Sequence, residues 1–141
     1  MHGGIMSTET NNLQTGVGLP NQIVSGRKKT MMNEFEIKKL MCDIGRRVYN
    51  RNMVAANDGN FSVKLNDDEF LCTPTGVSKG FMTPEYICKV NRKGEVIQAN
   101  AGFRPSSEIK MHMRVYEKRP DVGAVVHAHP TFATSFAIAG I

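Results

Sequence analysis

The feature of this chain that most constrains its fold is a run of apolar residues that ends in two histidines. The run is Val122–Val126, and His127, Ala128, His129 and Pro130 follow it. A short apolar run of this kind is typical of a buried strand. Because alternate side chains of a strand leave the same face, the two imidazoles are predicted to point the same way, with Cα atoms about 6.5 Å apart. Polar rings at the end of a buried strand are best explained by metal binding.

The rest of the pattern predicts helices that alternate with short strands. Apolar residues recur every three or four positions from residue 33 to residue 50, as in an amphipathic helix. Apolar and polar residues then alternate on either side of a turn at Asn66, which predicts a hairpin. The predicted helices are 33–50, a short one opened by Thr83-Pro84, 106–118 and 130–138; the predicted strands are 61–65, 69–72, 87–90, 95–98 and 122–129. This order favours an α/β or α+β sandwich with a mainly antiparallel sheet.

A length of 141 residues allows at most one domain. Residues 1–31 are rich in Gly, Asn, Thr and Ser and have no period, so they are predicted to be a disordered leader or an extension added for expression. The domain is predicted to occupy residues 32–141. Because the chain stops at Gly140-Ile141, at the end of an apolar segment, we expect this domain to be incomplete at its C-terminus.

Composition argues against several partners. The net charge of +5 is scattered, with no basic stripe interleaved with aromatic residues, so no nucleic-acid partner is expected. No apolar stretch approaches the roughly 20 residues that span a bilayer, and no signal peptide is recognisable, so no membrane association is expected. Cys42, Cys72 and Cys88 are odd in number and lack a Cys-x-x-Cys spacing, which predicts free thiols and a cytoplasmic protein.

Three side chains are candidates for chemistry at a metal. A catalytic zinc usually takes three protein ligands, and His127 and His129 would supply two. Glu108 begins the predicted helix 106–118 and is a candidate for proton transfer, although a solvated glutamate favoured by the helix dipole would look the same. His112 lies four residues further along that helix, and we favour a structural role for it.

Three turns are candidates for binding an anion. They are Gly59-Asn60, Thr75-Gly76 and Ser106-Ser107, each with a small polar side chain and exposed backbone N–H groups. The serine pair also opens a helix, where free N–H groups attract phosphate. Taken singly, each is also an ordinary turn or cap. No Walker loop or Gly-x-Gly-x-x-Gly motif is present, so nucleotide binding has no support.

Four motifs occur together in one order. They are Gly59-Asn60-Phe61-Ser62-Val63, Thr73-Pro74-Thr75-Gly76-Val77-Ser78, Arg104-Pro105-Ser106-Ser107-Glu108, and the segment 119–129 that ends in His127-Ala128-His129. In this combination the chain, from about residue 33 onward, resembles the class II aldolase/adducin family. The joint match is far more specific than any one motif.

This resemblance implies a fold and a set of site residues. The fold would be an α/β/α sandwich around a mainly antiparallel sheet, and the family is typically a tetramer with sites between subunits. The metal would be zinc, or another divalent ion. The implied metal ligands are His127 and His129, the acid/base residue is Glu108, and the substrate phosphate would be held by Asn60, Thr75, Gly76, Ser106 and Ser107.

The implied reaction is that of a zinc-dependent aldolase. It would cleave a phosphorylated sugar such as fuculose 1-phosphate to dihydroxyacetone phosphate and an aldehyde, through a metal-stabilised enediolate. Glu108 would move the proton at the adjacent carbon, which favours a pKa raised by a water-poor site. The family also supplies a third zinc-binding histidine and a tyrosine from beyond residue 141.

Three alternatives stay open within the same resemblance. A sugar-phosphate epimerase is disfavoured, because that branch tends to carry aspartate where Glu108 stands. A methylthioribulose-phosphate dehydratase is compatible with Glu108. An inactive, adducin-like fragment without enzymatic function is disfavoured by the presence of His127, His129 and Glu108 together.

Overall fold

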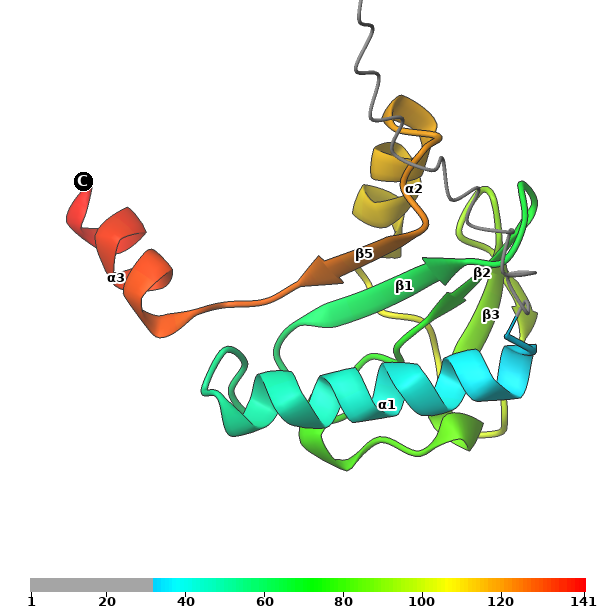
Figure 1. The fold of residues 1–141 in the computed structure, drawn as a ribbon, viewed down its shortest axis with the longest axis horizontal. Helices are drawn as coiled ribbons and strands as arrows, with labels where there is room; N and C mark the ends of the chain where they lie inside the picture. Colours follow the sequence, from blue (N-terminus) through cyan, green and yellow to red (C-terminus); the bar gives the residue numbers. More distant parts are fainter. Residues whose placement is uncertain (1–31) are drawn as a thin grey trace, which may run out of the picture. The chain divides into compact units, whose positions relative to one another are not determined.

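The strands of this protein form one antiparallel sheet, seen in a computed structural model that describes residues 32–141 (Figure 1). The strands are β1 (Asn60–Lys64), β2 (Glu69–Cys72), β3 (Cys88–Asn91), β4 (Val96–Gln98) and β5 (Ala124–His127). Their order across the sheet is β4-β3-β2-β1-β5, and each neighbouring pair is antiparallel. Short turns join β1 to β2 and β3 to β4, a longer segment that contains two 3₁₀ turns joins β2 to β3, and the chain then returns to place β5 beside β1. The prediction for residues 1–31 lies outside the described residues.

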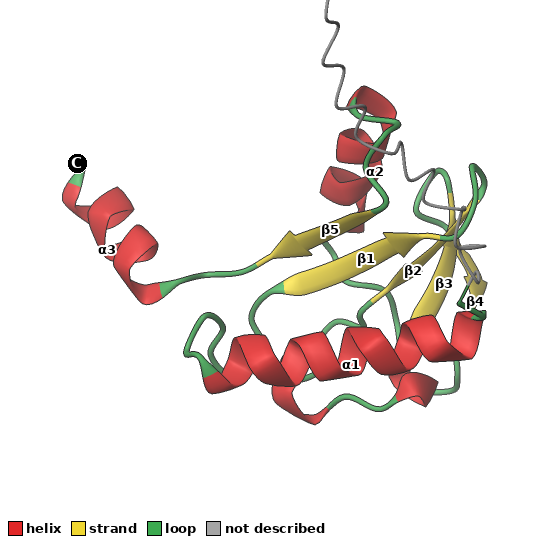
Figure 2. Ribbon diagram, viewed as in Figure 1, coloured by secondary structure: helices red, strands yellow, loops and turns green. Residues whose placement is uncertain are grey.

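Helices cover the two faces of this sheet. The helices are α1 (Glu34–Asn50), α2 (Ile109–Lys118) and α3 (Thr131–Ala139), with two 3₁₀ turns, η1 (Lys79–Phe81) and η2 (Pro84–Tyr86). Figure 2 shows α1 along one face and α2 on the opposite side. The start of α1 is fixed by a capping box, in which the Asn33 side chain accepts from the Glu36 N–H and the Glu36 carboxylate accepts from the Asn33 N–H, both at 2.9 Å.

The core is divided by the sheet into two apolar clusters. Neighbouring residues of β2 separate them, because Leu71 faces α1 and Phe70 faces α2. The cluster under α1 contains Met41, Cys42, Phe61, Leu71, Met82 and Ile87. The cluster under α2 contains Phe70, Cys72, Cys88, Val90, Ile109 and Tyr116. The predicted α/β/α sandwich around an antiparallel sheet is thereby confirmed.

Two predicted boundaries are wrong, and both lie close to the candidate site. The helix expected from Ser106 begins at Ile109, because Ser106–Glu108 form a turn in which the Ile109 N–H donates to the Ser106 carbonyl at 3.1 Å. The strand expected to be buried and to reach residue 129 ends at His127, and it is an edge strand whose residues are exposed or half-buried, with Val126 at 53% exposure. The N–H of His129 donates to the carbonyl of Met53 at 2.8 Å, and this contact takes the chain away from the strand ladder.

A close approach between α1 and η1 was not evident in the sequence. A Cβ atom added to Gly45 of α1 would lie 2.5 Å from the carbonyl oxygen of Lys79. A Cβ atom added to Gly80 would lie 2.7 Å from the ring of Tyr49. The two glycines therefore let η1 pack directly on α1, and this packing fixes the position of the Lys79 backbone.

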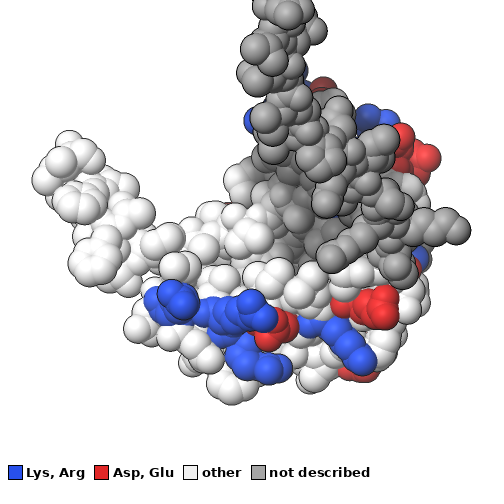
Figure 3. Space-filling view, in the orientation of Figure 1, with Lys and Arg blue, Asp and Glu red and all other residues white. Residues whose placement is uncertain are grey.

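The charged side chains on the face that carries α1 are mixed in sign. Figure 3 shows Lys and Arg gathered along this helix with Asp and Glu among them. Lys38 pairs with Glu34 at 2.8 Å, and Arg47 with Asp43 at 2.5 Å, each one helical turn apart. Among the described residues, no helix combines the length and apolar character required to cross a bilayer. The expected lack of a nucleic-acid partner stays a prediction.

All three cysteines are buried and free, as the sequence predicted. Burial raises the pKa of the Cys42 thiol to about 11 and that of Cys72 to about 12. Because the thiolate is the reactive form, the folded protein is expected to resist iodoacetamide at pH 8 and to be alkylated at all three positions in urea. Mass spectrometry before and after unfolding measures this. Rapid alkylation of the folded protein would contradict it.

Candidate active site

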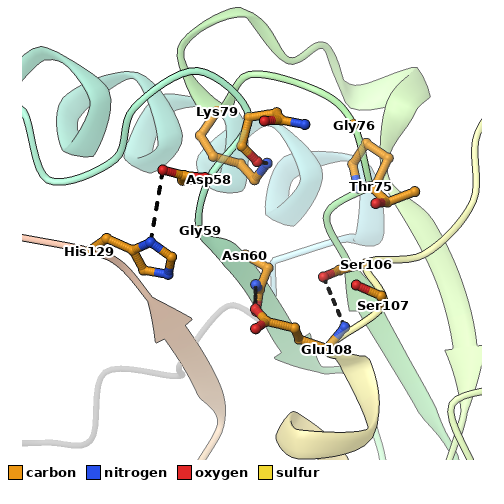
Figure 4. A pocket seen from close by; sticks show the side chains of 12 residues that line it. Asp58, Gly59, Asn60, Thr75, Gly76, Lys79, Ser106, Ser107, Glu108 and His129 are labelled. Carbon is orange, nitrogen blue, oxygen red and sulfur yellow. Dashed lines mark hydrogen bonds and ion pairs between the residues drawn. The ribbon is translucent and has the colours of Figure 1, made fainter.

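The predicted site residues meet in one pocket of about 210 Å³ at the end of the sheet where β1 begins and β5 ends. Figure 4 shows that four separate segments of the chain form its walls. The lining residues are Asn57, Asp58, Gly59, Asn60, Pro74, Thr75, Gly76, Lys79, Ser106, Ser107, Glu108 and His129. Of the predicted site residues only His127 is absent from this lining, and it contacts the lining residue Glu108.

Two of the predicted anion-binding turns are held side by side by backbone hydrogen bonds. The N–H of Thr75 donates to the carbonyl of Arg104 at 2.9 Å, and the N–H of Ser106 donates to the carbonyl of Thr73 at 3.1 Å. An isolated bridge between Pro74 and Pro105 lies between these bonds. This pairing brings the Thr75-Gly76 turn next to Ser106-Ser107, so the hydroxyl groups of both turns face one space.

The third turn needs glycine at position 59. Gly59 has a φ of +73°, a left-handed conformation that other residues adopt only with strain. A Cβ atom there would also lie 2.5 Å from Cγ1 of Val54 and 2.8 Å from the carbonyl oxygen of His127. The turn can therefore pass against β5 only without a side chain. It delivers Asn60 to the start of β1, directly opposite His127 in the ladder.

Asn60 faces the carboxylate of Glu108. Its amide Nδ2 donates a hydrogen bond to Oε2 of Glu108 and lies 3.3 Å from Nδ1 of His127. The side chain is almost fully buried, at 5% exposure, and its Oδ1 has no partner within residues 32–141. In the sequence Asn60 was a candidate phosphate ligand; in the structure it also orients the predicted acid/base residue.

The ionisation of Glu108 differs from the sequence-based expectation. The hydrogen bond from Asn60 holds the pKa of the carboxyl below its usual range, His127 acts in the same direction, and partial burial opposes both. The side chain is 46% exposed. The expected water-poor carboxyl with a raised pKa is therefore wrong for this arrangement, because donors to the carboxylate outweigh its burial.

The two histidines lie together, although only one belongs to the strand. Their ring centroids are 4.8 Å apart, with the planes inclined at 57°. Nδ1 of His127 lies 2.9 Å from Oε2 of Glu108, and Nδ1 of His129 lies 3.8 Å from Oδ2 of Asp58. A carboxylate at Nδ1 leaves Nε2 available as a metal ligand, which is how metal-binding imidazoles are commonly oriented.

The donor types fit a divalent metal, and the number of donors is smaller than a full set. Two imidazoles with adjacent carboxylates suit zinc. Within residues 32–141, however, no group of three or more His, Cys, Asp or Glu side chains is arranged to hold a metal ion. His127 and His129 therefore supply two donors of a suitable type, and the described residues do not complete a metal site.

His112 has the structural role that the sequence favoured. It is 1% exposed, and its Nδ1 lies 2.7 Å from Oγ of Ser62, which is in turn 2.8 Å from the hydroxyl of Tyr116. Burial lowers the pKa of the imidazole, which favours its neutral form. This buried network ties α2 to β1, so it fixes Glu108 at one end of α2 relative to Asn60 at the start of β1.

Lys79 lines the pocket although no pattern in the sequence predicted it. The residue is 1% exposed and belongs to η1. Its burial depends on the contact of η1 with α1, which joins segments more than thirty residues apart. In the sequence next to Lys79, Gly80 is a residue that permits close packing, but a glycine alone does not indicate an anion-binding site.

Comparison with known proteins identifies the family. Residues 39–141 match the family described as the class II aldolase and adducin N-terminal domain. This match takes in most of the chain.

The chain belongs to the class II aldolase and adducin family.

Several members of this family resemble the chain. Over 104 residues it is 36% identical to the 3-oxo-tetronate 4-phosphate decarboxylase of Haemophilus influenzae. This aligned stretch covers 74% of this chain and 48% of that protein. It is 37% identical to the L-fuculose phosphate aldolase of Methanococcus maripaludis, over 66% of this chain and 49% of that protein. It is 40% identical to the methylthioribulose-1-phosphate dehydratase of Gluconacetobacter diazotrophicus, over 64% of this chain and 43% of that protein.

The same resemblance holds in three dimensions. The crystal structure of YgbL from Klebsiella pneumoniae superposes with a TM-score of 0.69 at 31% identity, over 75% of this chain and 50% of that one. The chain thus has the class II aldolase fold. It spans about half the length of the curated relatives it matches.

Proposed function

We propose that this chain is the metal-binding and phosphate-binding part of a class II aldolase that cleaves a phosphorylated sugar. A substrate such as fuculose 1-phosphate would yield dihydroxyacetone phosphate and an aldehyde. The observation that carries the proposal is the single pocket in which Glu108, His129 and the two hydroxyl-bearing turns meet. Members of the family named for aldolase, decarboxylase and dehydratase activities on phosphorylated substrates support the substrate class.

Zinc is the metal we propose, with His127 and His129 as two of its ligands. When bound, it would act as a Lewis acid on the negative charge that develops on the substrate oxygen atoms. The chain's own contribution is to orient the imidazole of His127, whose Nδ1 lies 2.9 Å from the Glu108 carboxylate, whereas Asp58 lies beyond hydrogen-bond distance of His129, at 3.8 Å. The contact with Glu108 orients the His127 ring before a metal binds.

Glu108 is the residue we propose for proton transfer. In a retro-aldol cleavage the substrate hydroxyl loses its proton, the carbon–carbon bond breaks, and the carbon left behind must accept a proton. A carboxylate kept ionised by Asn60 is ready to take a proton and to return it to that carbon. Asn60, Thr75, Gly76, Ser106 and Ser107 would hold the phosphate, which fixes the reacting carbon relative to Glu108.

Decarboxylation of a phosphorylated 3-oxo acid is a second candidate. The similarity to a 3-oxo-tetronate 4-phosphate decarboxylase extends over 104 residues, the longest of the three relatives described above. The two reactions share their difficult step, because both break a bond next to a carbonyl and leave negative charge on the neighbouring carbon. They differ in the leaving group, since carbon dioxide departs without the hydroxyl proton that an aldol cleavage must remove.

The proposal is tested by metal content and by products. Zinc measured by elemental analysis of the complete enzyme, of which this chain is proposed to be a part, is expected near one ion per chain, and to be lost in His127→Ala but retained in His2→Ala. Metal-loaded protein is then incubated with fuculose 1-phosphate, 3-oxo-tetronate 4-phosphate or methylthioribulose 1-phosphate. Dihydroxyacetone phosphate supports the aldolase, carbon dioxide the decarboxylase, and a dehydrated product the dehydratase.

A lack of both metal and turnover would contradict the proposal. A complete enzyme that is metal-free and turns over none of the three phosphates would refute the enzymatic proposal and favour a non-enzymatic, adducin-like role. The tetrameric assembly and the cytoplasmic location stay predictions. Light scattering of the purified protein would measure the first.

A further inference from the structure

Lys79 is a buried cation at the wall of the pocket. Its side chain is 1% exposed, and Nζ donates to the carbonyl of Asn57 at 3.1 Å and to the carbonyl of Val77 at 2.5 Å. Within residues 32–141, Lys79 forms no ion pair with a carboxylate. Its two partners are both neutral, so the positive charge itself is not balanced by a direct contact.

An ammonium group in this position is costly unless an anion accompanies it. Removing a charge from water is strongly unfavourable even in a relaxed protein, and two carbonyls offset only part of this cost. Burial lowers the pKa of the Lys79 ammonium, and the nearby carboxylate of Asp58 opposes this effect. A dianion in the pocket would balance the charge more completely than Asp58 does at a distance.

The two carbonyl partners belong to two different walls of the pocket. Asn57 begins the turn that leads to Gly59 and Asn60, and Val77 follows the turn of Thr75 and Gly76. One ammonium group therefore connects the two turns. An ammonium carries three N–H bonds, so two donated bonds leave a third.

The position of the ammonium is set by packing rather than by the pocket. The carbonyl oxygen of Lys79 lies 2.5 Å from where a Cβ atom of Gly45 would be, so η1 packs closely against α1. The rest of the pocket is lined by hydroxyl, amide and backbone groups, by His129 and by the carboxylates of Asp58 and Glu108, so among the described residues Lys79 is the one lysine or arginine in this lining. Figure 4 shows the end of Lys79 between the Asp58 turn and the wall that carries Thr75.

We propose that Lys79 is the cationic ligand of the substrate phosphate, and that phosphate binding and the alignment of the two turns depend on the same ammonium group. This inference rests on the proposed function, because it takes a phosphate monoester as the occupant of the pocket. A dianionic phosphate matches a buried cation surrounded by neutral donors better than a singly charged carboxylate does. Asp58 would repel the phosphate if Lys79 did not offset its charge.

Inorganic phosphate is the probe for this inference, because its binding can be measured without catalysis. Isothermal titration and the phosphate-dependent rise in melting temperature are compared for the wild type, Lys79→Met and Lys93→Met. Lys93 is an exposed lysine in the turn after β3, and its replacement removes the same charge elsewhere. We expect the phosphate affinity to fall at least about tenfold in Lys79→Met and to be unchanged in Lys93→Met.

A second measurement uses the wild type alone, since removing a group that joins two turns can unfold the protein. With ¹⁵N-labelled lysine, the Nζ resonance of Lys79 is expected to shift on titration with phosphate, and the exposed lysines to shift little. Unchanged affinity in a folded Lys79→Met protein, or an unmoved Lys79 resonance at saturating phosphate, would overturn the inference and leave the proposed function standing. If the wild type binds no phosphate, the proposed phosphate site and this inference are both overturned.

Discussion

Replacing Glu108 by glutamine is expected to lower kcat for the sugar phosphate by about 10²–10⁴-fold, the usual contribution of general acid–base catalysis. Glutamine has nearly the shape of glutamate, and its carbonyl oxygen can still accept the hydrogen bond from Asn60. It cannot exchange a proton with a carbon atom. The loss should therefore appear in kcat, while KM and the affinity for inorganic phosphate change little.

A matched control lies in α2, the helix that Glu108 precedes. Glu117→Gln removes an exposed carboxylate that pairs with Arg114 at 2.5 Å on the surface of α2. Surface pairs of this kind contribute little, so this variant should keep the wild-type kcat and stability. The assay is steady-state release of dihydroxyacetone phosphate at saturating metal. A Glu108→Gln protein that retains more than about a tenth of the wild-type kcat would exclude Glu108 as the proton-transferring group.

Replacing Gly59 by alanine is expected to destabilise the protein by about 2–5 kcal/mol and to disturb the site. A left-handed backbone costs an alanine about 1–2 kcal/mol, and crowding in a packed interior adds about 1–3 kcal/mol. The added Cβ atom would meet the side chain of Val54 and the backbone carbonyl of His127, at distances that require both the Val54 side chain and the backbone at Gly59 or His127 to move. Because Asn60 pairs with His127, the movement should reach the proposed metal ligand as well.

Gly102 separates the two contributions. It has a φ of +87°, and a Cβ atom there would meet nothing within 4 Å. Gly102→Ala should therefore show the backbone cost alone, about 1–2 kcal/mol, and unchanged zinc content. Urea unfolding gives the free energies and elemental analysis gives the metal. Equal destabilisation by Gly59→Ala and Gly102→Ala would show that the contact with β5 is not tight.

The sequence predicted most of the secondary structure and the membership of the pocket. Local periodicity was enough for α1 and for the β1–β2 hairpin, because each buries a face whose spacing is visible in the chain. The joining of Thr75 with Ser106 could not be read from periodicity. It depends on backbone hydrogen bonds between distant segments, and only the order of motifs shared with the family anticipated it.

The properties that the sequence did not predict all depend on tertiary contacts. Ser106 and Ser107 look like a helix start, yet they form a turn because the Ser106 N–H is drawn to Thr73. The pKa of Glu108 is lowered by Asn60, a residue 48 positions away in the chain. Lys79 resembles a surface lysine in the sequence, and its burial requires Gly45 of α1 to meet η1.

The strand β1 supplies groups to both faces of the sheet and to the pocket within four consecutive residues. Asn60 contacts Glu108, Phe61 lies in the cluster under α1, Ser62 bonds to His112, and Val63 packs beneath α1. Changes in this strand cannot alter substrate preference independently of folding. Laboratory evolution toward a new phosphorylated substrate should therefore leave β1 almost invariant.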